Sequence, residues 1–165
     1  MGVVIFNKKN ICKINKEDIK DLKEKARHAT DGKARLCLHK SNENLLHEMI
    51  IVLRKGTYVR PHAHKKKTET FHLIEGRVKV IIFKESGLVK DSLVMDSLVQ
   101  KGDFICRLEE GVWHMVIPLS DFSVFHEVTN GPYLGKDDSV FAGWAPFTKE
   151  KDKVKLFMEE ICRLK

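Results

Sequence analysis

Three side chains between Gly56 and Gly76 have the types and the spacing of a metal site. His62 and His64 are two residues apart, and Glu69 follows five residues later, in a segment with alternating apolar residues. In a β-strand, residues i and i+2 point to the same face, so two imidazoles and a carboxylate can converge on one point. We predict that this segment supplies most of the ligands of a metal ion.

A fourth candidate ligand is His114, which follows a predicted turn containing Gly111. Three histidines and one glutamate would occupy four positions of an octahedral ion and leave two open for water or a bidentate substrate, as Lewis-acid catalysis requires. Such a mixed set of nitrogen and oxygen ligands suits Fe(II), Mn(II), Ni(II), Co(II) or Zn(II). We expect one divalent transition metal and leave its identity open.

Three further residues are candidates for substrate chemistry. Tyr58 and Arg60 share the parity of His62 if the strand continues through Pro61. Tyrosine can donate a proton, and the planar arginine fork suits a carboxylate or phosphate. Glu127, on a later predicted strand, would act as a general base or hold a metal ligand in place. The alternatives are a rim ion pair for Arg60 and a solvated strand residue for Glu127.

Short β-type runs separated by glycines must position these residues. Predicted strands cover residues 35–39, 46–53, 58–60, 70–74, 77–83, 88–95, 104–107, 113–118 and 123–128. Predicted helices cover residues 15–28, with Asn15 as N-cap, and 148–164, with Thr148 as N-cap. Many close strands without helices between them indicate an antiparallel sandwich or barrel. We divide one domain, residues 1–165, into an N-terminal segment and helix (1–33), a β-barrel (34–128), and a loop with a C-terminal helix (129–165).

The composition is that of an ordinary globular protein, with 42% apolar and 32% charged residues among 165. The four cysteines form no CxxC pair, which argues against a structural zinc site and favours a reducing cytoplasm. We find no signal peptide and no apolar segment long enough to span a membrane. The apolar residues 3–6 could add a strand to a partner's sheet, so we expect a homodimer.

The formal net charge of +7 has two readings. Lysines scattered over both ends of the chain keep a small protein soluble, and we prefer this reading to nucleic-acid binding. The tight basic run at residues 65–67 lies inside the predicted site. We expect it to attract a small anionic or sugar-like ligand, with Lys67 as a substrate-binding residue.

The spacing from Gly56 to Gly76 resembles the first cupin motif, and residues 102–114 resemble the second, with Glu109 in place of its usual proline. The segments KARLCLHKS, TYVRPHAHKKKTETF, HEVTNGPY and FAGWAPF are together similar to WbuC-type cupin metalloproteins. This resemblance implies a mainly β cupin fold, a double-stranded β-helix or antiparallel jelly-roll barrel with flanking N-terminal and C-terminal helices. The similar segment HEVTNGPY includes Glu127.

The WbuC-type resemblance implies a role in bacterial O-antigen and surface-polysaccharide biosynthesis. The leading hypothesis is a metal-dependent isomerase or epimerase of a sugar or nucleotide-sugar intermediate, in which Glu127 or Tyr58 moves a proton. An Fe(II)-dependent dioxygenase would use the same ligands and the same two open positions. A non-catalytic metal-binding or sugar-binding module is the third possibility, because a fold does not determine a function.

Overall fold

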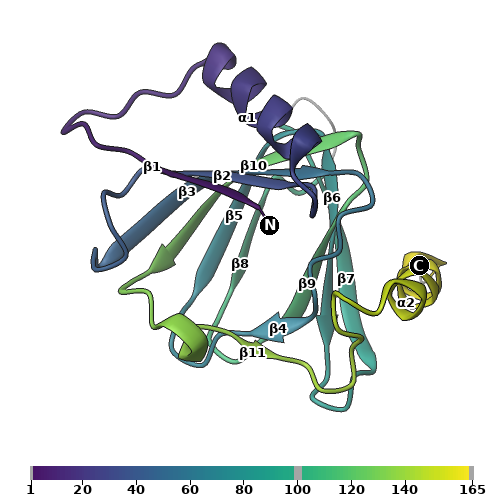
Figure 1. Ribbon diagram of the computed structural model, residues 1–165. Coiled ribbons are helices and arrows are strands. Elements are labelled where there is room, and N and C mark those ends of the chain that lie inside the picture. The colour runs from purple at the N-terminus through teal and green to yellow at the C-terminus, as the bar shows by residue number, and fades with distance from the viewer. Residues whose placement is uncertain (1, 99–101, 164–165) are drawn as a thin grey trace.

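Two β-sheets facing each other make up most of the molecule (Figure 1). The computed structural model describes residues 2–98 and 102–163. One sheet has the order β1-β2-β3-β10-β5-β8, with strands Val3–Phe6, Lys33–Cys37, Leu46–Arg54, Phe122–Asn130, Glu69–Glu75 and Ile105–Leu108. The other has the order β11-β4-β9-β6-β7, with strands Val140–Phe141, His62–Ala63, Trp113–Pro118, Arg77–Phe83 and Val89–Asp96.

The pairings confirm the predicted antiparallel jelly roll. Every named pair of strands is antiparallel except β1 with β2. Between the residues that the structure describes, the ladders form two separate sheets instead of one closed barrel. Alternate side chains of both sheets point between them and form the main apolar core, which includes Met49, Phe71, Val80, Val116 and Phe125.

Helix α1 (Lys16–His28) covers the outer face of the larger sheet (Figure 1). Leu22 and Ala26 are buried against Ile50 and Val52 of β3. The predicted cap is confirmed, because the Asn15 side chain accepts hydrogen bonds from the first turn while the Asp18 carboxylate accepts one from the Asn15 N–H. The helix therefore supports β2 and β3 from outside.

Helix α2 (Lys151–Arg163) lies beside the smaller sheet, where Ile161 packs with Tyr58 and Met115. The predicted start after Thr148 was wrong. The chain first makes a turn in which the Glu150 carboxylate accepts a hydrogen bond from the Phe147 N–H, so the helix begins at Lys151, two residues later than predicted. The predicted last residue, Leu164, lies outside the described residues.

Three other local predictions were wrong. Residues 58–60 are irregular, because the extended chain pairs with a neighbour only at β4, after Pro61. The predicted loop 129–147 contains the end of β10, a 3-10 turn (Gly135–Asp137) and β11, and its Gly131–Pro132 peptide bond is cis. Residues 3–6 pair with β2 of their own chain instead of adding a strand to a partner's sheet.

No helix in the described part of the chain has the length and apolarity to cross a membrane.

Candidate metal centre

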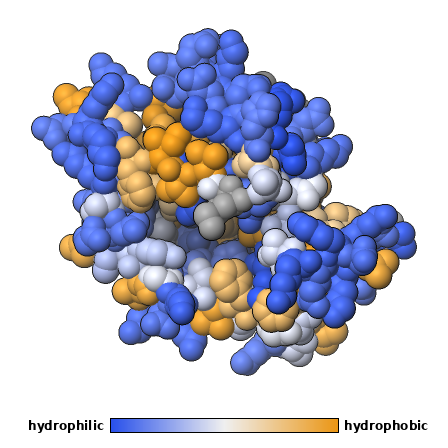
Figure 2. Space-filling view, viewed as in Figure 1, coloured by the Kyte–Doolittle hydropathy of each residue, from blue (hydrophilic) through white to orange (hydrophobic). Residues whose placement is uncertain are grey.

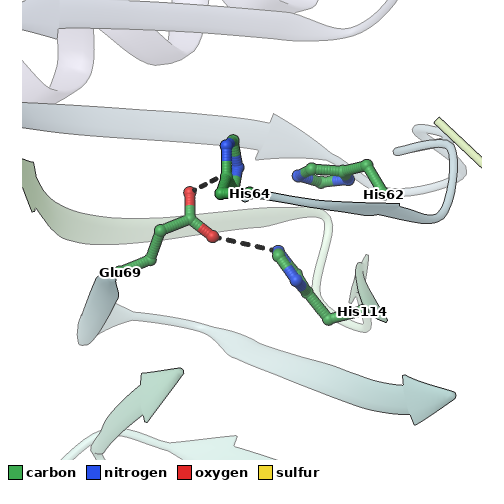
Figure 3. Close-up of side chains that lie close together, drawn as sticks. All are labelled: His62, His64, Glu69 and His114. Carbon is green, nitrogen blue, oxygen red and sulfur yellow. Dashed lines mark ion pairs between the residues drawn. The ribbon is translucent and has the colours of Figure 1, made fainter. Parts of the chain in front are cut away.

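Four residues from three parts of the fold meet between the sheets (Figure 3). His62 lies in β4 and His64 directly follows it, while Glu69 is the first residue of β5. His114 lies in β9, directly opposite His62 in the ladder between β4 and β9. The two sequence motifs are therefore brought together by strand pairing, as their spacing predicted.

The donor atoms of this cluster lie close enough to surround one ion. Oε1 of Glu69 is 3.1 Å from Nε2 of His64, and Oε2 of Glu69 is 3.1 Å from Nε2 of His114. One potential ligand atom from each of the four residues lies within 4.8 Å of the other three. Ligands on opposite sides of an ion lie about 4.2 Å apart when each bond is about 2.1 Å. A small contraction of the cluster would thus bring all four ligand atoms within bonding distance of one ion.

The backbone orients all three imidazoles in the same way. The Nδ1 atoms of His62, His64 and His114 lie 2.9, 2.7 and 2.9 Å from the carbonyl oxygens of residues 60, 138 and 112, respectively. A carbonyl oxygen only accepts, so each Nδ1 carries the proton, and in a neutral ring the Nε2 lone pair is free. This is the arrangement that metal-binding histidines commonly use.

The electrostatics of the cluster favour an ionised Glu69 carboxylate and a neutral His62 ring. Burial, with the neighbouring His114 ring, lowers the pKa of His62 to about 3. Burial alone would raise the pKa of Glu69, but its contacts with His114 and His64 outweigh this and lower that pKa strongly. Burial would lower the pKa of His64, yet its close contact with the negatively charged Glu69 carboxylate raises it. Glu69 is therefore ionised over the whole physiological pH range.

Two buried atoms of the cluster lack a satisfactory hydrogen bond. His64 Nε2 lies 3.1 Å from Glu69 Oε1, and Glu69 Oε2 lies 3.1 Å from His114 Nε2, but neither contact has the geometry of a hydrogen bond. Buried polar atoms left in this way cost free energy unless another partner satisfies them. A divalent cation bound by these lone pairs would satisfy both, so the residues present fit a metal ion.

A glycine turn links the two halves of the cluster. Gly111 has φ of 75°, in the left-handed region that favours glycine, and its N–H donates to the His64 carbonyl oxygen at 2.8 Å. This hydrogen bond ties the turn before His114 to the strand that carries His62. The replacement of the usual proline by Glu109 has not prevented this turn.

A cavity of about 680 Å³ extends from the cluster toward β1 and β2. The side chains of Phe71, Phe125 and Glu127 line it between its two ends. Figure 2, viewed from the same side as Figure 1, shows a hollow below an apolar patch that lies beside α1. The cluster is therefore reachable from solvent through a partly apolar channel.

Glu127 lies in the wall of this cavity, one strand away from Glu69. It is half-buried, and it has no hydrogen bond or ion pair with another side chain among the described residues. Burial and the negative charge of Glu69 raise its pKa to about 8, and the charge of Arg35 opposes this. The carboxyl group is mostly protonated at neutral pH and is exposed to the cavity.

The other predicted substrate residues lie differently. Lys67 lines the cavity but is buried and pairs with Asp138, with Nζ 2.5 Å from Oδ1. Arg60 also lines it, yet its guanidinium donates to the Ala142 carbonyl at 2.6 Å and lies over the Phe147 ring at 4.2 Å. Both cations are used mainly to hold the loop that follows β10.

The structure does not bring Tyr58 to the cluster. Its side chain is buried against Phe157 under α2, and its hydroxyl donates to the Pro146 carbonyl at 3.0 Å. The parity argument that placed Tyr58 with Arg60 and His62 was wrong because residues 58–61 are not a strand.

Several cavity residues were not foreseen from the sequence. Lys33 and Arg35 line the cavity from β2, and His39 and His47 do so with stacked rings 4.1 Å apart. Alternation within 33–37 could have placed the two cations on one face, but only the pairing of β2 with β3 shows that this face points inward.

Comparison with solved structures identifies the fold. Protein SO0799 from Shewanella oneidensis superposes with a TM-score of 0.56 at 14% sequence identity, covering 78% of this chain and 85% of that protein. CapF, in a complex with the inhibitor 3-isopropenyl-tropolone, gives 0.51 at 15% identity and covers 65% of this chain, which spans only 31% of CapF. KdgF from Halomonas sp. gives 0.49 at 13% identity, over 62% and 82% of the two chains.

The two likenesses with a TM-score above 0.5, together with the two-sheet topology, show a mainly β, cupin-type fold, and the cluster forms a metal-capable centre within it. Residues 14–95 also match the family model described as a domain of unknown function (DUF6016). No curated protein matches the chain.

Proposed function

We propose that the protein binds one divalent transition metal through His62, His64, Glu69 and His114 and acts on a small anionic or sugar-like molecule beside it. The single observation that carries this proposal is the shared orientation of the three imidazoles, whose Nδ1 atoms face backbone carbonyls. When bound, the ion would supply Lewis-acid polarisation of a substrate carbonyl or hydroxyl group.

Glu127 is the proton carrier in this proposal. Its carboxyl group faces the same cavity, and burial raises its pKa from that of a solvated carboxyl toward neutral pH, where it can both give and accept a proton. Proton removal and return at a carbon next to a carbonyl group gives isomerisation or epimerisation.

The biological setting rests on sequence likeness. The segments shared with WbuC-type cupins support a substrate from bacterial O-antigen or other surface-polysaccharide biosynthesis. The same resemblance supports a homodimer, which light scattering after size-exclusion chromatography would test. The cysteines Cys12, Cys37, Cys106 and Cys162 are free, which suits the reducing cytoplasm that we propose as its location.

Metal binding is tested by elemental analysis of purified variants. The double variant His62→Ala/His64→Ala should lose the bound metal, whereas the wild-type protein should hold about one ion per chain. The matched control is His72→Ala, because His72 is exposed on the same strand as Glu69. Equal metal content in wild type and double variant would overturn the proposal.

Proton transfer is tested by solvent-deuterium exchange into a panel of nucleotide sugars and uronic acids, followed by NMR. We expect exchange next to a carbonyl group with metal-loaded wild type and a loss of about 100-fold or more with Glu127→Gln, which should keep its metal. Exchange at the wild-type rate in Glu127→Gln would remove Glu127 from the reaction. Oxygen consumption by the Fe(II)-loaded protein without exchange would replace the isomerase proposal by a dioxygenase.

A further inference from the structure

Two cations at the mouth of the cavity face inward from β2. Lys33 and Arg35 are two residues apart on this strand, and Arg35 lies opposite Ile51 of β3, which lines the same cavity. Arg35 is exposed at the opening, whereas Lys33 is half-buried. Alternation along β2 thus places both charges on the wall that a ligand must pass.

The partners of these two cations differ from those of the other cations that line the cavity. Lys67 is paired with Asp138, and the Arg60 guanidinium donates to the backbone carbonyls of Ala142 and Ala145. Neither Lys33 nor Arg35 forms an ion pair with a carboxylate in the part of the chain that the structure describes.

The groups nearest to Lys33 and Arg35 leave much of their positive charge uncompensated. A guanidinium nitrogen of Arg35 lies 3.9 Å from the Met49 sulfur, which carries no charge. Asp31 lines the cavity near Lys33 and accepts a hydrogen bond from its backbone N–H at 3.3 Å. Glu127 also lines the cavity, where burial favours its neutral form, and it forms no ion pair with Arg35 among the described residues. Neither cation is therefore neutralised by a direct carboxylate contact in that part of the chain.

The strand register gives the distance between this cationic mouth and the metal-capable cluster. Glu69 lies opposite Thr129 on β10, and Phe125, four residues back, lies opposite Ile51, which pairs with Arg35. Four residues along the strands span about 14 Å, and three spacings between neighbouring strands span about 14 Å across the sheet. The Cα atoms of Glu69 and Arg35 are therefore at most about 20 Å apart. A ligand that reaches both ends must therefore be elongated.

The wall between the two polar ends is mostly apolar. Met49, Ile51, Phe71 and Phe125 line the cavity there, together with the ionisable Glu127. A ligand that spans the cavity would therefore touch metal-binding groups at one end, apolar side chains in the middle and two cations at the other end.

We infer that the site takes an elongated ligand with a metal-chelating head and a terminal anionic group, a carboxylate or a phosphate, that Lys33 and Arg35 hold. This inference rests on the proposed metal site and adds the second recognition point. Arginine and lysine together bind such anions through charge-assisted hydrogen bonds. The exposed lysines Lys65 and Lys66 have no part in it.

A matched pair of chelators tests this inference by titration calorimetry on the zinc-loaded protein. The probes are 4-carboxybenzohydroxamate and 4-methylbenzohydroxamate, which share a chelating head and a rigid apolar body and differ only in the terminal charge. We expect the carboxylated probe to bind at least about tenfold more tightly. A third probe, 4-phosphonobenzohydroxamate, shows whether a carboxylate or a phosphate-like dianion is preferred.

The variant Lys33→Gln/Arg35→Gln should bring the carboxylated probe down to the affinity of the methyl probe and leave the methyl probe unchanged. Arg35→Lys should retain part of the preference, and the control Lys65→Gln/Lys66→Gln should retain all of it. Thermal unfolding confirms that each variant is folded.

The outcomes separate this inference from the proposed function. Equal binding of both probes to wild type, or a preference that survives in the double glutamine variant, overturns the anionic subsite while leaving the metal site intact. Binding of neither probe to the zinc-loaded protein means that the zinc has no positions open to a chelating head, which overturns the proposed metal site beside a substrate and this inference with it.

Discussion

The two ends of the cavity differ in how fully their polar side chains are held by partners within the protein. At the cluster end, each imidazole is held by a backbone carbonyl, and Glu69 contacts two of them. At the mouth, Lys33 and Arg35 face the cavity, and neither is paired with a carboxylate of residues 2–98 or 102–163. The first end is organised before any ligand arrives, as a metal site requires, and the second is left incomplete, as an anion site requires.

The largest effect should come from removing the carboxylate that organises the cluster. Glu69→Gln loses the only anionic ligand and the ionic contacts to His64 and His114. We expect metal affinity, measured by competition with a chelator, to fall by at least about 1,000-fold, more than the loss of an outer partner causes. The control Glu110→Gln changes an exposed glutamate near His114 and should keep wild-type affinity. Comparable affinities for the two variants would contradict an organised cluster end.

The next effect concerns the ion pair that closes the cluster end. Lys67→Gln leaves Asp138 with an uncompensated charge, so we expect a loss of about 3 kcal/mol in the free energy of unfolding. Urea unfolding measures it, and the exposed neighbour Lys66→Gln should stay within about 0.5 kcal/mol of wild type. A large loss in both variants would mean that the lysine run acts as a whole.

Glu127, between the two ends, should make stability depend on pH. Its pKa is raised from 4.5 to about 8 by burial and by Glu69, so the folded state binds its proton more tightly than the unfolded state. The resulting stability is complete below about pH 4.5 and is lost as the pH rises through about 8.

We expect this loss to be about 2–3 kcal/mol, less than the full shift implies because Glu127 is only half-buried. Urea unfolding of the metal-free protein at pH 5 and pH 9 should show it in wild type and not in Glu127→Gln. The same pH dependence in both proteins would contradict the assignment.

The smallest effect should come from the outer support of the mouth. Asn15→Ala removes the cap of α1, which packs behind β3 next to β2, and we expect about 1 kcal/mol lower stability. Thermal unfolding measures this, and metal affinity should not change. A drop in metal affinity would show that the two ends of the cavity are more strongly linked than their separate contacts indicate.

The cluster could be foreseen because period-two spacing and a single turn place its members. His62, His64 and Glu69 need only extended backbone, and His114 needs the turn at Gly111. The cap at Asn15 is equally local. The inward orientation of Lys33 and Arg35 depends instead on which face of β2 meets β3, which no local pattern states.

The misplacements have the same cause. Tyr58 was assigned by strand parity, but the chain before Pro61 is irregular and turns the phenol ring under α2. Lys67 was expected to bind substrate, yet it is buried and pairs with Asp138, which comes from a segment distant in sequence that strand β11 holds beside β4. Long-range pairing decided both positions.

The central claim is that one metal ion lies among His62, His64, Glu69 and His114. The most direct measurement is anomalous diffraction from crystals of the purified protein at the absorption edge of the metal found in it. We predict one strong anomalous peak within bonding distance of three histidine Nε2 atoms and a Glu69 oxygen. A metal-replete crystal with no peak at this position, or with its peak elsewhere, would contradict the account.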